Sequence, residues 1–101
     1  MKTGEKVSSQ ERIFIITDLL FKHHVSGLSN KELAGLTGTS EANICRDLAV
    51  FEQYKWVIRD SSAKWRLSPD FGSIAGHLMK SYQKAKLLLT EEEARYAAAM
   101  Q

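Results

Sequence analysis

The spacing of apolar residues along the chain predicts helices on both sides of a short β segment. From Ile13 to Leu20 and from Leu33 to Phe51, apolar residues recur three or four positions apart, as on a helix with one buried face. Between residues 56 and 68 the pattern becomes β-favouring. After Pro69 the helical spacing returns. The chain is therefore expected to be mainly α with a small β-hairpin.

Capping signals divide the first helical region into separate helices. Ser29 and Glu32 have the spacing of a capping box, which predicts a helix that opens directly after Ser29. Gly38 should end this helix, because glycine enters the left-handed conformation without a Cβ penalty. Ser40 is a good N-cap for the next helix, expected over residues 40–54. The two helices and the turn at Gly38 predict a helix-turn-helix.

The helix expected over residues 40–54 has two different sides. Its apolar stripe consists of Ile44, Leu48 and Phe51. Its opposite side presents Ala42, Asn43, Arg46 and Ala49. Small side chains with one arginine and one amide permit close approach to base edges, where Arg suits guanine and Asn suits adenine. This side predicts a helix that enters the major groove of DNA, although similar helix pairs also occur in small proteins that do not bind DNA.

A basic hairpin is expected directly after this helix. Residues 56–59 and 65–68 are β-favouring runs, and residues 60–64 between them are turn formers. Arg59, Lys64 and Arg66 lie on or beside the predicted tip and solvent face. A hairpin in this position makes the predicted fold a winged helix, with the wing along the phosphate backbone. Alternatively, the charges only prevent pairing at the edge of the sheet.

The order and spacing of these pieces resemble the DNA-binding domain of the isocitrate-lyase-regulator (IclR) family over residues 11–78. The matching segments are Arg12–Leu20, Gly27–Ser29, Glu32–Ala34, Thr37–Gly38, Ile44 with Arg46 and Leu48, Val57–Asp60, Trp65–Pro69 and Phe71–Gly76. The resemblance implies a winged helix-turn-helix transcription factor that binds a palindromic operator as a dimer. The family's effector domain has no counterpart here, so no small-molecule effector is expected.

Three departures from the family pattern limit what the resemblance implies. Ala42 and Asn43 replace a usual Ser-Thr pair, so the base preference of the family does not carry over. Asp47 stands where leucine is common and leaves a carboxylate beside the buried stripe. Lys55 replaces a glycine that closes the recognition helix, and positive φ costs a lysine about 1 kcal/mol. We therefore expect this helix to end differently.

Three regions are expected: a loose tail over residues 1–9, the winged helix-turn-helix over 10–69, and a C-terminal helical extension over 70–101. Ser8 or Ser9 is a candidate cap for the first helix. The predicted core consists of Ile13, Ile16, Leu19, Leu20, Leu33, Leu36, Ile44, Leu48, Phe51, Val57, Trp65 and Leu67. Trp56 is expected to anchor the wing.

The C-terminal extension carries more apolar surface than one small domain needs. Leu87, Leu88 and Leu89 cover more than one side of the helix expected there. This predicts a homodimer through the C-terminal helix, unless the leucines fold back onto the same domain. Thr90 to Glu93 has the pattern of a second capping box, which predicts a kink or a new helix at Thr90.

Composition adds modest constraints. The 101 residues carry a net charge of +2, which rises to +4 without the acidic segment from Thr90 onward. This predicts moderate, salt-sensitive DNA affinity. We expect neither a membrane span nor a signal peptide, and the single cysteine suits the reducing cytoplasm.

Other chemistries find little support in the sequence. His23, His24, His77 and Cys45 lack the spacing of metal ligands. Catalytic motifs such as a phosphate-binding loop or a nucleophile elbow are missing from the sequence. We therefore expect no enzyme, no metal and no cofactor.

The candidate DNA-binding residues fall into three groups by the part of the DNA that they are expected to meet. Ser40, Glu41, Ala42, Asn43 and Arg46 are expected in the groove. Ser29, Asn30 and Lys31 are expected on the backbone at the preceding helix, and Ser62, Lys64 and Arg66 on the backbone at the wing. The alternative is a winged-helix module that binds protein, which Glu41, Asp47 and the modest net charge favour.

Overall fold

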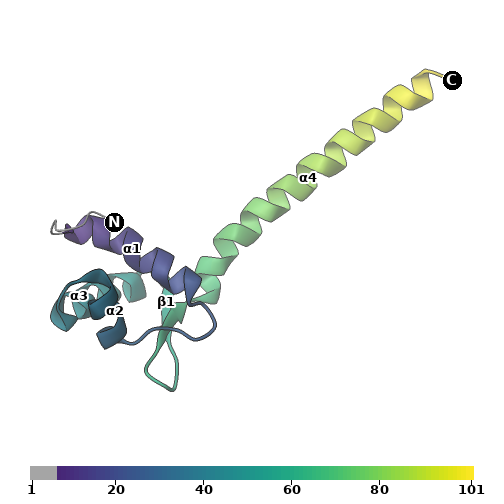
Figure 1. Ribbon diagram of the computed structural model, residues 1–101. Helices are drawn as coiled ribbons and strands as arrows, with labels where there is room; N and C mark the ends of the chain where they lie inside the picture. The colour runs from purple at the N-terminus through teal and green to yellow at the C-terminus, as the bar shows by residue number, and fades with distance from the viewer. Residues whose placement is uncertain (1–6) are drawn as a thin grey trace. The chain divides into compact units, whose positions relative to one another are not determined.

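The computed structural model describes residues 7–101 and contains four helices and one hairpin in that range (Figure 1). The elements are α1 (Ser9–Lys22), α2 (Asn30–Thr37), α3 (Glu41–Gln53), β1 (Val57–Arg59), β2 (Trp65–Leu67) and α4 (Pro69–Ala99). They form two units: the first ends at Phe71 and the second comprises Gly72–Gln101. The mainly helical fold with a small antiparallel hairpin is thus confirmed.

The cap of α1 is Ser8, one of the two serines expected there. Its side chain accepts a hydrogen bond from the backbone N–H of Glu11 at 3.1 Å, and the helix begins at Ser9. The expected tail over residues 1–9 is therefore one residue too long at its C-terminal end. Residues 1–6 lie outside the described part of the chain.

The caps predicted for α2 and α3 are confirmed. Ser29 and Glu32 form both bonds of the capping box, at 3.1 and 3.0 Å. Gly38 ends α2 in the left-handed region with φ of 70°. The Ser40 side chain accepts from the Asn43 N–H at 3.2 Å, so α3 begins where the sequence predicts.

The core of the first unit gathers apolar side chains from α1, α2, α3 and the hairpin. Its buried members are Ile16, Leu20, Leu28, Leu33, Ala34, Ile44, Leu48, Phe51, Val57, Trp65 and Leu67, and Ile13, Leu19, Trp56 and Phe71 pack against them. The prediction that Leu36 is buried is wrong, because its side chain is 46% exposed. Thr37 takes the inward place, and its hydroxyl donates to the Leu33 carbonyl at 2.6 Å.

The hairpin is antiparallel and pairs Val57 with Leu67 and Arg59 with Trp65. Each strand is one residue shorter than predicted. Leu28 adds a bridge to Trp65, with backbone hydrogen bonds of 3.0 and 2.8 Å in the two directions. Gly27 precedes it with φ of +72°, and a Cβ there would lie 2.9 Å from the Trp65 carbonyl oxygen. The loop after α1 is thereby fixed to the hairpin.

The end of α3 shows how the chain tolerates a lysine where glycine would fit better. Lys55 adopts φ of 61°, in the left-handed region. Directly after it, the Trp56 N–H donates to the Phe51 carbonyl at 2.9 Å. The Trp56 ring packs between Phe51 and Phe71, with centroid distances of 6.1 and 4.6 Å. Lys55 therefore makes the turn that brings Trp56 onto the core.

Helix α4 is continuous from Pro69 to Ala99, so the prediction of a kink or new helix at Thr90 is wrong. The Thr90 hydroxyl donates to the Lys86 carbonyl at 2.9 Å within the helix and does not serve as a cap. Every side chain from residue 72 to residue 101 is exposed, including the leucines at 87–89. Within residues 7–101, no helix is both long enough and apolar enough to cross a membrane.

Candidate nucleic-acid interface

The exposed face of α3 is narrow and has mostly small side chains. At about 100° per residue, Ala42, Arg46, Ala49 and Gln53 lie along one line opposite the buried stripe of Ile44, Asp47, Leu48 and Phe51. Ala42 and Ala49 lie about one helical turn before and after Arg46, so the Arg46 guanidinium extends farther from this face than its neighbours do. Gln53 continues the line by one turn. It is a candidate that sequence reasoning missed, although its spacing of seven from Arg46 was visible in the sequence.

A chain of hydrogen bonds holds Arg46 on this face. The Arg46 guanidinium donates to the Asn43 side-chain oxygen at 2.7 Å, and the Asn43 amide donates to the Thr39 hydroxyl at 2.9 Å. Asn43 therefore already uses its oxygen and one N–H within the protein. The atoms with which Asn43 is expected to read adenine are thus partly used within the protein, where its oxygen orients Arg46.

An ion pair fixes α3 from its buried side. Arg12 of α1 donates from Nε and Nη2 to the two carboxylate oxygens of Asp47 at 2.5 and 3.1 Å. Both side chains are 9% exposed. The hydrogen bond to Asp47 raises the pKa of Arg12, whereas burial acts in the opposite direction. The carboxylate that departs from the family pattern is thus neutralised inside the fold and does not face the candidate interface.

At the start of α2, two expected DNA contacts are engaged within the protein. The Ser29 side chain belongs to the capping box. Asn30 accepts from the Trp65 indole N–H at 2.6 Å and donates to the Cys45 sulfur at 3.3 Å. Asn30 therefore joins α2 to the hairpin and to the exposed flank of α3. Lys31, next to it, is exposed, and its side chain makes no hydrogen bond or ion pair within residues 7–101.

Lys64 at the hairpin forms an ion pair with Glu32 of α2. The hydrogen bond from Lys64, followed by those from Ser29, lowers the pKa of Glu32 to about 2. Lys64 was expected to meet DNA phosphate and has a carboxylate partner instead. Any phosphate at this point has to compete with Glu32.

The other hairpin cations also contact the protein. Arg66 donates to the Val25 carbonyl at 3.4 Å, and its Nε is buried without a hydrogen-bond partner among the described residues. Arg59 lies over the Trp65 ring with 5.2 Å to the centroid. Asp60 accepts from the backbone N–H groups of Ser62 and Lys64 at 2.8 and 3.0 Å, which shapes the tip. The exposed tip residue Ser62 remains accessible.

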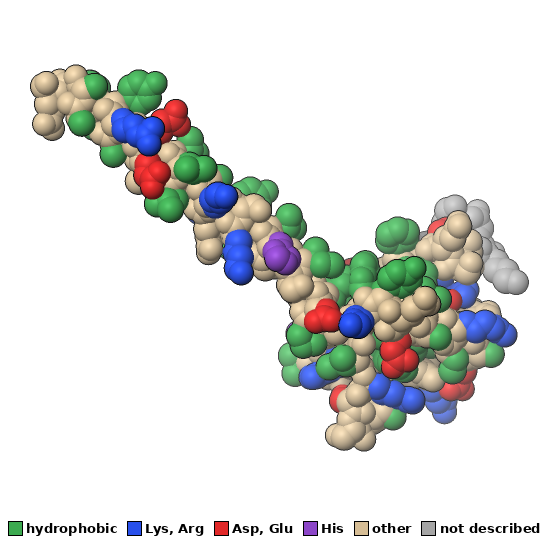
Figure 2. All heavy atoms as spheres, turned by 180° about the vertical axis from the view of Figure 1, so that it is seen from behind, with side chains coloured by type: hydrophobic (Ala, Val, Ile, Leu, Met, Phe, Trp, Pro, Cys, Tyr) green, Lys and Arg blue, Asp and Glu red, His purple; other side chains and the backbone are tan. Residues whose placement is uncertain are grey.

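Charges of both signs are interspersed over the first unit in the view of Figure 2. Glu41 lies exposed in the first turn of α3, beside Ala42. Three lysines and arginines of the candidate interface have partners within the chain, which are Asn43 for Arg46, Glu32 for Lys64 and the Val25 carbonyl for Arg66. Of these three cations only Lys64 faces a carboxylate, whereas Arg46 and Arg66 donate to neutral oxygens and keep their full charge.

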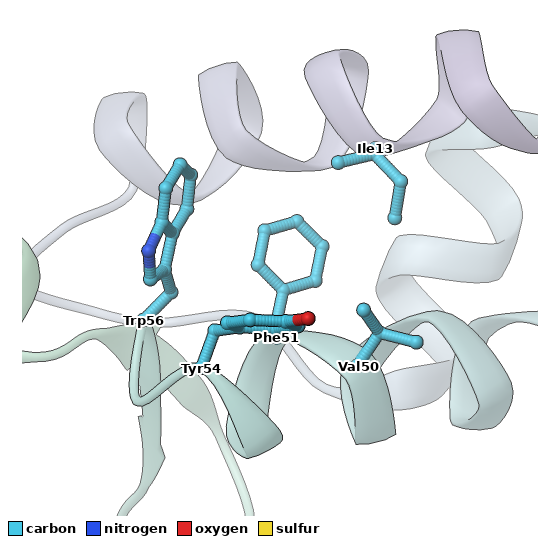
Figure 3. A pocket seen from close by; sticks show the side chains of 5 residues that line it. All are labelled: Ile13, Val50, Phe51, Tyr54 and Trp56. Carbon is cyan, nitrogen blue, oxygen red and sulfur yellow. The ribbon is translucent and has the colours of Figure 1, made fainter.

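A separate apolar hollow of about 230 Å³ lies between α1 and the C-terminal half of α3. Figure 3 shows Ile13 on one side and Val50, Phe51 and Tyr54 on the other, with Trp56 at the end. Its lining has apolar and aromatic side chains and can accept an apolar group of a partner. Sequence reasoning missed this hollow, because Val50 and Tyr54 do not belong to the core stripe.

Metal chemistry has no geometric basis in the described residues: no three His, Cys, Asp or Glu side chains of residues 7–101 gather where they could hold an ion. Cys45 is exposed and accepts the hydrogen bond from Asn30. Comparison of the chain with protein-family models, with curated proteins and with solved structures found no match in any of the three.

Proposed function

We propose that the first unit is a winged helix that binds double-stranded DNA, with α3 in the major groove. The observation that carries this proposal is the position of Asn30. Its two hydrogen bonds join the N-terminus of α2, the hairpin and the exposed flank of α3. These are the three elements that a winged helix presents to DNA, and in this chain one side chain holds them together.

In this proposal Arg46 reads a base. The alanines at positions 42 and 49 let the helix approach base edges, and the Asn43 side-chain oxygen accepts a hydrogen bond that holds the guanidinium of Arg46 on this face. A guanidinium held in this way suits the two acceptors of guanine, O6 and N7. Gln53 lies on the same face and suits adenine. Specificity thus comes from Arg46 and Gln53, with Asn43 as a positioning residue.

The phosphate backbone is met by the flanking elements. Lys31 at the start of α2 is exposed, and the N-terminal end of α2 carries the partial positive charge of the helix dipole. Ser62 at the hairpin tip offers a hydroxyl. Lys64 contributes only after it leaves Glu32, so the wing binds phosphate more weakly than its charge suggests. The affinity of the first unit for DNA should be moderate and should fall steeply as the salt concentration rises.

Selection of bound duplexes from a random pool tests this proposal. We expect enrichment of a short motif that contains guanine. The Arg46→Ala protein should lose the preference at that guanine and keep it elsewhere. Recovery of unselected sequences at low salt would contradict base reading by α3.

We propose that this DNA binding serves transcriptional regulation, as the resemblance to the IclR family implies. A second candidate function is a protein-binding module, which the apolar hollow at Ile13, Phe51 and Trp56 favours. Gel shifts on mixed genomic fragments at two salt concentrations separate the two functions. DNA binding predicts a shift that weakens with salt, whereas a protein-binding module predicts no shift at either concentration.

A further inference from the structure

Helix α4 carries an apolar stripe that no other part of residues 7–101 covers. Along residues 74–100, the eight positions 74, 78, 82, 85, 89, 92, 96 and 100 lie within about 40° of one line at 100° per residue. Six of them are large and apolar: Ile74, Leu78, Tyr82, Leu89, Tyr96 and Met100. Their exposed fractions range from 49% to 86%. A stripe of this kind is stabilised by burial against another helix.

The steps between successive positions of this stripe form the same series from the N-terminal end as from the C-terminal end. These steps are 4, 4, 3, 4, 3, 4 and 4 residues. A second copy that runs in the opposite direction, centred on residue 87, therefore places stripe against stripe over the whole length. The opposed pairs are Ile74 with Met100, Leu78 with Tyr96, Tyr82 with Glu92, and Ala85 with Leu89. Small Ala85 meets large Leu89, and the Tyr82 hydroxyl meets the one carboxylate of the stripe.

The lysines and glutamates of α4 are separated along its length. Lys80, Lys84 and Lys86 precede residue 87, and Glu91, Glu92 and Glu93 follow it, with Arg95 beyond them. Red and blue side chains therefore both appear toward the C-terminal end of α4 in Figure 2. The nearest pair, Lys86 and Glu91, is five residues apart, whereas ion pairs on one helix need three or four. Within residues 7–101, none of these lysines forms an ion pair with these glutamates.

The two blocks of charge discriminate between orientations of a second copy. Parallel helices in register place glutamates opposite glutamates, with Glu92 facing Glu92 in the seam, and lysines opposite lysines. Antiparallel helices place the glutamates of each copy opposite the lysines of the other. In that arrangement Glu92 lies opposite Tyr82 and within about one helical turn of Lys84 in the other copy. Charge complementarity therefore favours the antiparallel pair.

We propose that α4 forms an antiparallel homodimer with α4 of a second copy, with the symmetry centre at the level of residue 87 along the helix, in which Glu92 of each copy pairs with Tyr82 and Lys84 of the other. The contact extends over residues 74–100, about 40 Å of helix at 1.5 Å per residue. This proposal concerns α4 alone and does not depend on DNA binding by the first unit.

Charge exchange in the full chain tests the proposal by sedimentation equilibrium. Glu92→Lys and Lys84→Glu should each weaken dimerisation by about tenfold, because two symmetric attractions become repulsions. The double variant should return to within about threefold of the original affinity on the same basis. Lys84, about 120° from the stripe line, reaches the seam only through its long side chain. Glu91→Lys is the matched control: it makes the same charge change about 140° from that line, where the shorter glutamate side chain does not reach the seam, and it should leave the dimer unchanged.

Cross-linking tests the orientation. In a Cys45→Ser background, a mixture of Leu78→Cys and Tyr96→Cys proteins treated with a short bis-maleimide should give the cross-linked heterodimer, and neither protein alone should cross-link. Circular dichroism at the same concentration verifies that each variant keeps its helix content. Cross-linking of either protein with itself, a monomer at tens of micromolar, or a double charge variant no better than the single ones would each overturn the proposal.

Discussion

Arg12 and Asp47 are 35 residues apart in the sequence and are joined by two hydrogen bonds between buried side chains. The pair connects α1 to the inner side of the helix whose outer side carries Arg46. The orientation of the candidate interface therefore depends on a contact at the opposite face of α3. A buried pair of this kind contributes little net stability relative to apolar side chains, but the loss of one partner leaves an uncompensated charge.

We predict that Asp47→Ala lowers the free energy of unfolding by about 3–5 kcal/mol, because it leaves the Arg12 guanidinium buried and unpaired. Urea denaturation followed by circular dichroism measures this change. The double variant Arg12→Met with Asp47→Leu is the control and should be about as stable as the original chain. An Asp47→Ala protein of unchanged stability would show that the pair is not buried in solution.

Glu32 predicts a dependence of stability on acid pH. Lys64 and Ser29 lower its pKa from 4.5 to about 2, so its contribution is complete above pH 4.5 and is lost as the pH falls toward 2. Glu32→Gln, which retains the capping-box pattern, should remove this part of the acid dependence. Thermal melts of both proteins between pH 6 and pH 2 provide the measurement, with about four pH points over the range in which this group titrates. If the melting temperatures of the two proteins fall equally with pH across this range, the assignment is refuted.

The same substitution should strengthen non-specific DNA binding. Without the carboxylate, Lys64 is free to meet a phosphate, which should steepen the salt dependence by about one counterion. Titration of a random duplex at several salt concentrations provides the slope. Glu11→Gln on α1 removes an equal charge far along the sequence from the hairpin and serves as the control. Equal slopes for the Glu32→Gln and Glu11→Gln proteins would mean that Lys64 does not reach the backbone.

Much of the first unit could be predicted from short-range signals. Ser29, Gly38 and Ser40 each act on a backbone group within a few residues, so their positions determine the ends of α2 and α3 without tertiary information. The alternation of Val57, Trp65 and Leu67 similarly identified the buried side of the hairpin. Local physical chemistry is sufficient for such elements.

The remainder depended on contacts that are distant in sequence. Hydrophobicity alone predicts that Leu36 is buried, but the rotation of α2 places Thr37 inward, where its hydroxyl donates a hydrogen bond to a backbone carbonyl. The pairing of Arg12 with Asp47 and the bonds of Asn30 require the packed fold. Thr90 resembles a cap in sequence, yet α4 has no interruption there at which its hydroxyl would act as one.

Lys55 offers a test of backbone strain. Its φ of 61° disfavours any residue with a Cβ, so Lys55→Gly should stabilise the first unit by about 0.5 kcal/mol after the larger chain entropy of glycine is included. Urea denaturation measures this gain. Lys55→Ala keeps the strain and removes the charge, and it should show no gain. A Lys55→Gly protein less stable than Lys55→Ala would indicate that the turn is not strained.

The central claim is that Arg46 reads a base from the exposed face of α3. The most direct test is a gel-shift titration of the selected duplex and of a random duplex with the original chain, Arg46→Ala and Arg46→Lys. Both variants should lose about 1–3 kcal/mol on the selected duplex, because lysine cannot reproduce the two-pronged contact to guanine. Arg46→Lys should bind random DNA as the original chain does. Equal losses on both duplexes, or full retention of affinity by Arg46→Ala, would contradict the account.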